Sequence, residues 1–123
     1  MKIIFTIGDC NGIGLECFFK ALKKISNEAN YKEAEFFIAG NKKTIFDYAS
    51  QCAFDFFNES QLKEINQSII HINNINCEII DCEEYAEVEF GRESKEAGRL
   101  AVASLKYASK ETLAGSFDAV VTL

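Results

Sequence analysis

A strand that leads through a glycine-rich turn into a helix is the feature that most constrains how this chain can fold. The apolar run Ile3–Ile7 precedes the turn Gly8–Gly14, and apolar residues then recur at helical spacing: Leu15, Phe18, Leu22 and Ile25. Such a turn places backbone N–H groups and a helix N-terminus at the carboxyl edge of a sheet, where open α/β sheets bind ligands. The turn therefore predicts an α/β fold with a candidate binding site at this edge.

The glycine spacing matches neither of the two common nucleotide-binding loops. The dinucleotide fingerprint G-x-G-x-x-G would need a glycine where this chain has Cys10, and the phosphate loop would need one at Ile13. The next predicted strand ends in Ala39-Gly40-Asn41, without the carboxylate that reads a ribose in dinucleotide sites. From spacing alone, the turn is either a tight strand-to-helix connection or part of a binding site.

The rest of the chain alternates between apolar runs and helical periodicity. Residues 2–7, 36–39 and 117–122 are apolar runs without alternation, typical of strands covered on both faces, so we expect them inside a mainly parallel sheet. Helices are predicted over 13–26, 42–53 and 94–114, the last with a small-residue stripe of Ala97, Ala101, Leu105 and Ala108. We therefore expect residues 1–123 to form a single α/β unit, with a mainly parallel sheet and flanking helices.

The middle of the chain is less regular. Residues 68–72 and 76–81 are short β-type runs joined by Asn73-Asn74-Ile75, and they form either a hairpin or two separate strands. An acidic patch follows, which we interpret as a solvated loop because it lacks the turn chemistry of a calcium loop. Its members are Glu83, Glu84, Glu87 and Glu89.

Composition excludes several classes of function. The formal net charge of −6 argues against nucleic acid as a partner. The sequence contains no apolar run of 18 residues, so it predicts no membrane span. The N-terminus has no signal-peptide pattern, so we expect a cytoplasmic protein. The five cysteines, at positions 10, 17, 52, 77 and 82, have no zinc-ligand spacing and are expected to be reduced and mostly structural. His71, the single histidine, is expected to be a surface or packing residue, so we predict no metal ligands in this chain.

Three segments together resemble one enzyme family. Thr6–Glu16 is similar to T-x-G-D-P-x-G-I-G-P-E, which opens the 4-hydroxythreonine-4-phosphate dehydrogenases. Gly91–Val102 is similar to that family's G-x-x-S-x-x-A-G-x-x-A segment before a long helix, and Leu113–Thr122 to its L-x-G-x-x-D-A-[LIV]-V-T strand. The segments occur in the family's order and separation. The chain departs from the opening motif at Cys10 and Leu15, where the family has proline.

The resemblance implies an enzyme of pyridoxal phosphate (vitamin B6) biosynthesis. Such an enzyme uses NAD to oxidise the C3 hydroxyl of 4-phosphohydroxy-L-threonine, a small phosphorylated amino acid, and then decarboxylates the product. A divalent metal (zinc, magnesium or cobalt), a homodimer and a fold like the isocitrate and isopropylmalate dehydrogenases are implied as well. By this resemblance the substrate–cofactor cleft is lined by Gly8, Asp9, Asn11, Gly12 and Gly14.

The family's remaining motifs have no counterpart in this chain. A P-I-N-K loop, a substrate-binding His-Thr pair and metal-binding histidines follow the V-T strand in that family. We therefore expect the chain to be the N-terminal part of a longer dehydrogenase, with no catalytic residue in this span and no activity alone. The alternative is a non-catalytic α/β remnant that binds a phosphate-bearing ligand or a partner chain. The reading frame beyond Leu123 would discriminate between the two.

Overall fold

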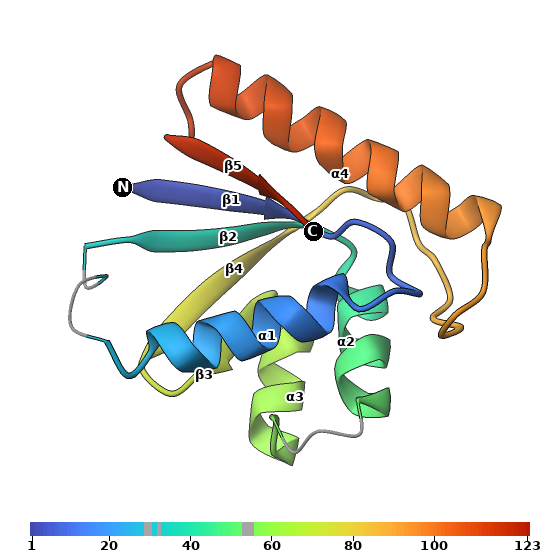
Figure 1. The fold of residues 1–123 in the computed structure, drawn as a ribbon, viewed down its shortest axis with the longest axis horizontal. Coiled ribbons are helices and arrows are strands. Elements are labelled where there is room, and N and C mark those ends of the chain that lie inside the picture. Colours follow the sequence, from blue (N-terminus) through green and yellow to red (C-terminus); the bar gives the residue numbers. More distant parts are fainter. Residues whose placement is uncertain (29–30, 32, 53–55) are drawn as a thin grey trace.

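Five strands form one sheet in the order β3-β4-β2-β1-β5 (Figure 1). The computed structural model describes residues 1–28, 31, 33–52 and 56–123. Along the chain the elements are β1 (Lys2–Thr6), α1 (Gly14–Ile25), β2 (Glu35–Gly40), α2 (Lys42–Gln51), α3 (Glu59–Asn66), β3 (Ile69–Ile72), β4 (Ile75–Asp81), α4 (Lys95–Leu113) and β5 (Ala119–Thr122). Strands β4, β2, β1 and β5 are parallel and β3 is antiparallel to β4, so the predicted α/β fold with a mainly parallel sheet is confirmed.

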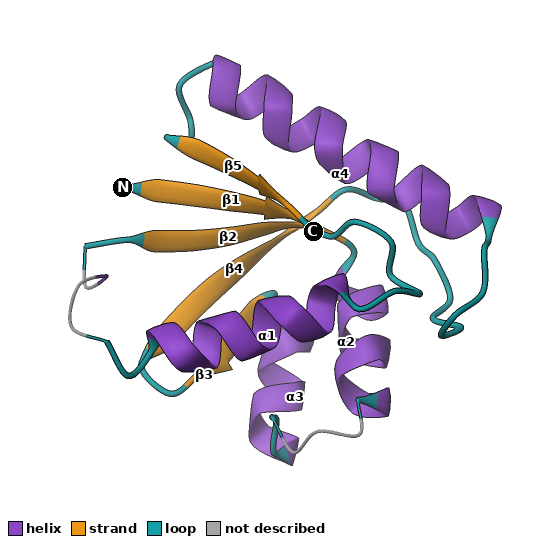
Figure 2. Cartoon of the chain, viewed as in Figure 1, coloured by secondary structure: helices purple, strands orange, loops and turns teal. Residues whose placement is uncertain are grey.

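Helices cover the two faces of the sheet unequally. Of the described helices, α1, α2 and α3 lie on one face and α4 lies on the other (Figure 2). The larger core lies beneath α1 to α3 and includes the fully buried Phe19, Ile38 and Ile45. A smaller cluster beneath α4 is centred on Ile4 and Ala108. β1 pairs with β2 and β5, and β2 pairs with β1 and β4, so these two strands are interior, as predicted.

The irregular middle of the chain forms a helix and a hairpin. β3 and β4 pair antiparallel with Ile72 opposite Ile75, so the hairpin alternative is correct, and Asn73 adopts a φ of 54° in its turn. The preceding helix α3 is not predicted by periodicity. It begins with a capping box in which the Asn58 side chain accepts from the Gln61 N–H, and the Gln61 side chain accepts from the Asn58 N–H.

The prediction that 117–122 is an interior strand is wrong. β5 pairs with β1 and is the last strand of the described sheet, and Val121 is 40% exposed. An apolar run indicates that both faces of a strand can be buried. Whether the strand is interior depends on which strands pair with it, and therefore on the strand order of the whole sheet. β5 is therefore an edge strand that α4 covers on one face.

The buried stripe of α4 also differs from the predicted one. Ala97, Leu100, Ser104 and Ala108 are buried, whereas Leu105 is 45% exposed. Ser104 is polar and absent from the predicted stripe, but its hydroxyl donates to the carbonyl of Ala101 and is satisfied within the helix. α2 ends at Gln51, and residue 53 of the predicted helix 42–53 lies outside the described residues. None of the described helices combines the length and apolar character needed to cross a membrane.

Candidate active site

The glycine turn lies at the carboxyl edge of the sheet, against the last residue of the sequence. Gly8 has a φ of +63°, and a Cβ at this position would lie 2.3 Å from the backbone oxygen of Leu123. A Cβ at Gly14, the first residue of α1, would lie 3.2 Å from the Leu123 Cβ. Glycine is thus required at position 8 by the approach of Leu123 and by the left-handed backbone, whereas a Cβ at position 14 would be in tight contact with the Leu123 side chain.

Asp9 and Gly12 shape the outer part of the turn. The Asp9 carboxylate accepts from the N–H of Asn11 at 3.0 Å, and its backbone oxygen accepts from the N–H of Gly12 at 3.1 Å. Gly12 has an ordinary φ, and a Cβ there would meet its nearest neighbour, the Asp9 backbone oxygen, at 3.4 Å. A side chain at Gly12 would therefore meet this chain only in ordinary contacts with Asp9.

Asn11 joins the glycine turn to the segment that precedes α4. Its buried side chain accepts from the N–H of Glu89 and donates to the carbonyl of Arg92, both at 2.8 Å. Its backbone carbonyl accepts from the N–H of Gly91 at 2.9 Å. With both ends of its amide occupied, Asn11 holds the site together rather than presenting a free side chain to a ligand.

Two side chains of α2 contact the segment before α4 and the glycine turn. The Thr44 hydroxyl donates to the carbonyl of Ala86 at 2.8 Å, and the Tyr48 hydroxyl donates to the carbonyl of Gly12 at 3.0 Å. The Tyr48 ring packs edge-on against Phe90 with ring centroids 5.0 Å apart. Burial raises the pKa of Tyr48 to about 12, so this hydroxyl keeps its proton and remains a donor.

Two hollows flank the turn. One, of about 350 Å³, lies between the turn and the N-terminus of α4, where the Ser94 hydroxyl accepts from the N–H of Ala97 at 3.0 Å. Its lining is Asp9, Glu93, Ser94, Ala97, Gly98 and Ala101. The other, of about 450 Å³, is lined mainly by apolar atoms of Gly12, Ile13, Tyr48, Cys52 and Phe90, with Asn11, Glu16, Gln51 and Gly91. The structure thus brings the five predicted cleft residues together at one edge, where Gly8 and Gly14 pack inward and the other three border the two hollows.

The residues considered for metal binding do not gather here. His71 lies on β3 with its Nδ1 3.5 Å from the Glu64 carboxylate, and Glu89 pairs with Arg92 at 2.9 Å. Within the described ranges, no group of three or more His, Cys, Asp or Glu side chains could hold a metal ion.

The five cysteines are free thiols in different surroundings. Burial, assisted by the Asp9 charge, raises the pKa of Cys10 to about 11, and burial with the Asp81 charge raises the pKa of Cys82 to about 11. Burial also raises the pKa of Cys77, whereas Cys17 is exposed on α1.

We expect iodoacetamide at about pH 8 to alkylate Cys17 at least about tenfold faster than Cys10, Cys77 or Cys82, because a raised pKa leaves little reactive thiolate. Peptide mass spectrometry over time measures the rates, and the urea-unfolded chain, in which all five should react alike, is the control. Cys10 reacting first would contradict this account.

Comparisons with known proteins identify what the chain resembles. Residues 32–123 match the family model described as pyridoxal phosphate biosynthetic protein PdxA. The 4-hydroxythreonine-4-phosphate dehydrogenase of Sulfurihydrogenibium sp. (strain YO3AOP1) is 33% identical over 124 residues, covering 100% of this chain and 35% of the relative. The protein of the same name from Nostoc sp. (strain PCC 7120 / SAG 25.82 / UTEX 2576) is 27% identical over 121 residues, covering 98% and 31%. The chain therefore spans about a third of the length of these relatives. No solved structure matches it.

Proposed function

The chain belongs to the PdxA family of pyridoxal phosphate biosynthetic proteins, and on this premise we propose that it is the N-terminal part of an NAD-dependent dehydrogenase acting on 4-phosphohydroxy-L-threonine. The proposed reaction is oxidation of the C3 hydroxyl followed by decarboxylation. The observation that carries the proposal is the meeting of the glycine turn, the Asn11 contacts and the N-terminus of α4 at the carboxyl edge of the sheet. We extend the proposal to the whole fold, as the N-terminal part of an isocitrate/isopropylmalate-dehydrogenase-like enzyme, and to a homodimer in that longer enzyme.

The first turn of α1 suits the phosphate of this substrate. Its N-cap, Ile13, makes no side-chain capping hydrogen bond, so no side chain of the cap competes with an anion for the helix N-terminus. Asp9 would serve a different part of the substrate. One of its carboxylate oxygens accepts from Asn11, and the other can accept from the ammonium or hydroxyl group of the amino acid.

The described residues do not by themselves form a site for either of the implied cofactors, NAD and a divalent metal. NAD would accept the hydride from C3, and a divalent metal would stabilise the charge on the C3 oxygen. The described residues provide no metal-binding group. Asn41, at the position where dinucleotide folds carry an acidic ribose ligand, uses its side-chain oxygen to cap α2 through the N–H of Thr44 at 3.0 Å.

We expect the 123-residue chain to be silent as a dehydrogenase. Hydride transfer requires the substrate to be held against the nicotinamide from two sides with water excluded, and the glycine turn provides one side. The assay is NADH formation from 4-phosphohydroxy-L-threonine with added zinc, magnesium or cobalt, and the control is heat-denatured chain. Turnover above that control would indicate that the site is complete within these residues.

Gly12→Val tests the binding site directly. In wild-type chain, saturating 4-phosphohydroxy-L-threonine should shift the backbone amide NMR signals of the turn between Gly8 and Glu16. The valine side chain should abolish those shifts by filling the space beside the turn, while the free energy of unfolding falls by only about 1 kcal/mol because Gly12 has an ordinary φ. Ala114→Val, at an exposed residue with a φ of −75° at the far end of α4, is the control. Unchanged shifts in Gly12→Val, or none in the wild type, would contradict the proposed site.

A further inference from the structure

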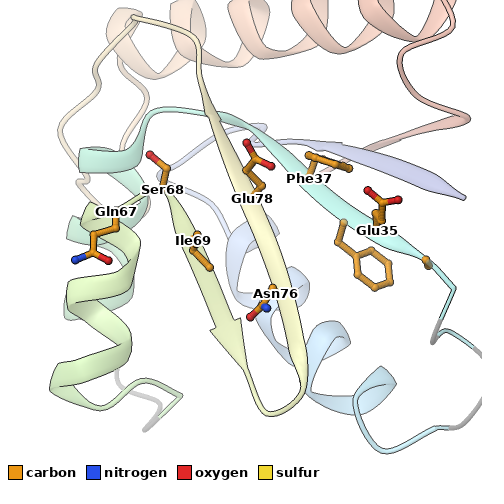
Figure 3. Close-up of a pocket in the computed structure, with 9 residues that line it drawn as sticks. Glu35, Phe37, Gln67, Ser68, Ile69, Asn76 and Glu78 are labelled. Atoms are coloured by element: carbon orange, nitrogen blue, oxygen red, sulfur yellow. The ribbon is translucent and has the colours of Figure 1, made fainter.

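Asn11-Gly12 is the single Asn-Gly pair in the sequence. In a flexible chain such a pair loses the side-chain amide of asparagine more readily than other pairs do, because glycine has no Cβ to obstruct the attacking backbone nitrogen. Asn76, which extends from β4 (Figure 3), is exposed but is followed by Cys77, whose side chain hinders the same attack. The sequence therefore indicates that Asn11 is the asparagine most prone to deamidation.

In the folded chain, hydrogen bonds occupy the backbone N–H and carbonyl groups of both Asn11 and Gly12. The N–H of Asn11 donates to the Asp9 carboxylate at 3.0 Å, and that of Gly12 donates to the Asp9 carbonyl at 3.1 Å. The Asn11 carbonyl accepts from the N–H of Gly91 at 2.9 Å. The Gly12 carbonyl accepts from the Tyr48 hydroxyl at 3.0 Å. The pair is therefore held by its own turn and by two other segments of the chain.

The side chain that would react is held as well. Its oxygen accepts from the N–H of Glu89 and its nitrogen donates to the Arg92 carbonyl, both at 2.8 Å, and Asn11 is only 3% exposed. To attack Cγ of Asn11, the Gly12 nitrogen must give up the proton that it now shares with the Asp9 carbonyl. The planar amide, bound at both ends, must also become tetrahedral. The fold therefore opposes the reaction at the attacking nitrogen and at the amide.

We propose that Asn11-Gly12 is a deamidation site that the fold protects and that unfolding exposes. In the unfolded chain the Gly12 nitrogen forms a bond to Cγ of Asn11, the bond from Cγ to Nδ2 breaks, and ammonia leaves with the proton of the Gly12 N–H. Water then opens the resulting succinimide at either of its two C–N bonds, which gives aspartate or isoaspartate. The deamidation site does not depend on the proposed activity.

Neither product can rebuild the contacts of Asn11. Aspartate places a carboxylate oxygen opposite the Arg92 carbonyl, where asparagine donates, and isoaspartate adds a carbon atom to the backbone of the turn. A chain that deamidates while it is unfolded therefore returns to a less stable fold, in which the segment before α4 is held less firmly against the glycine turn.

The rate of deamidation in the folded and the unfolded chain tests the proposal. Asn11 is the only asparagine in the tryptic peptide 3–20, so mass spectrometry of this peptide measures its rate directly. At about pH 8, the rate in guanidinium chloride should exceed the rate in buffer at least about tenfold, because the folded chain reacts only when it opens. Asn76 should stay largely intact in both conditions.

Gly12→Ala separates the chemistry from the fold. In guanidinium chloride it should deamidate at least about tenfold more slowly than the wild type, because the new methyl group hinders the attack. A Cβ at this position makes only ordinary contacts in the folded chain. The rate of this variant in guanidinium chloride tests the chemistry whether or not the variant folds.

Tyr48→Phe tests the protection. It removes the donor to the Gly12 carbonyl, so the rate in buffer should rise about twofold to tenfold while the rate in guanidinium chloride stays the same. Tyr107→Phe, on α4, is the matched control and should change neither rate. Purified deamidated chain should unfold at a lower urea concentration than unmodified chain. The proposal is overturned by equal rates in buffer and guanidinium chloride, by a faster rate in buffer, by an unchanged rate in Tyr48→Phe, or by deamidated chain as stable as the unmodified one.

Discussion

Gly8→Ala is expected to lower the free energy of unfolding by about 2–5 kcal/mol. Two independent costs combine at this residue. A φ of +63° is unfavourable for any residue with a Cβ, and that Cβ would lie 2.3 Å from the oxygen and 2.9 Å from the carbon of the Leu123 backbone carbonyl. Backbone atoms cannot move aside as the end of a flexible side chain can. The new methyl group should therefore push the end of β5 away from the turn.

Gly91→Ala separates the two costs. Gly91 also has a positive φ, +75°, but a Cβ there would meet nothing within 4 Å. This variant should lose only the conformational part, about 1 kcal/mol. Urea denaturation of the wild type and both variants measures the difference, and the amide signals of β5 should shift in Gly8→Ala alone. Equal losses in the two variants would contradict a close approach between Gly8 and Leu123.

Local patterns were enough to predict most elements of the fold. β1, α1 and α4 follow from apolar spacing and, for α4, from the Ser94 cap, because these signals lie within one element. α3 was missed because it is short and buries Ile65 alone, so its periodicity is weak. Its capping box, Asn58 with Gln61, is a sequence signal that could have revealed it.

Long-range contacts within the site could not be predicted in the same way. Gly8 is adjacent to Leu123 and Asn11 to Glu89 and Arg92, although they are far apart in sequence. The sequence shows that glycine is present at position 8. It does not show which part of the backbone lies against that glycine. Likewise, the family resemblance places Asn11 in the cleft, whereas both ends of its amide hydrogen-bond the loop before α4 in the structure.

The three segments that resemble the dehydrogenase family meet in space. The turn within Thr6–Glu16 contacts Leu123 just beyond Leu113–Thr122, and Asn11 hydrogen-bonds Gly91 and Arg92 at the start of Gly91–Val102. Motifs that serve only the packing of their own elements would have no reason to converge. Their common location at the carboxyl edge favours one shared site, to which Asn11 contributes by positioning the segment before α4.

Asn11→Asp should therefore destabilise the chain in a pH-dependent way. Aspartate has nearly the same shape, and one of its oxygens can still accept from the N–H of Glu89. The other would face the carbonyl oxygen of Arg92, where asparagine now donates at 2.8 Å, so two acceptors would oppose each other at a residue only 3% exposed. At about pH 8 we expect a loss of about 2–4 kcal/mol in the free energy of unfolding.

Protonation of the new carboxyl group reverses part of this loss. Burial and the nearby Asp9 raise the pKa of the new aspartate in the folded chain above its unfolded value, so the folded state binds a proton more tightly. The deficit relative to wild type should therefore shrink as pH falls through the raised pKa, because the protonated acid can donate to Arg92 as the amide did.

Urea denaturation of both proteins at about pH 8 and about pH 5 measures the change in this difference. Asn74→Asp, in the exposed β3–β4 turn, should show a small deficit at both pH values. A deficit in Asn11→Asp that stays constant with pH, or falls below about 1 kcal/mol at pH 8, would mean that the amide of Asn11 does not hold the segment before α4.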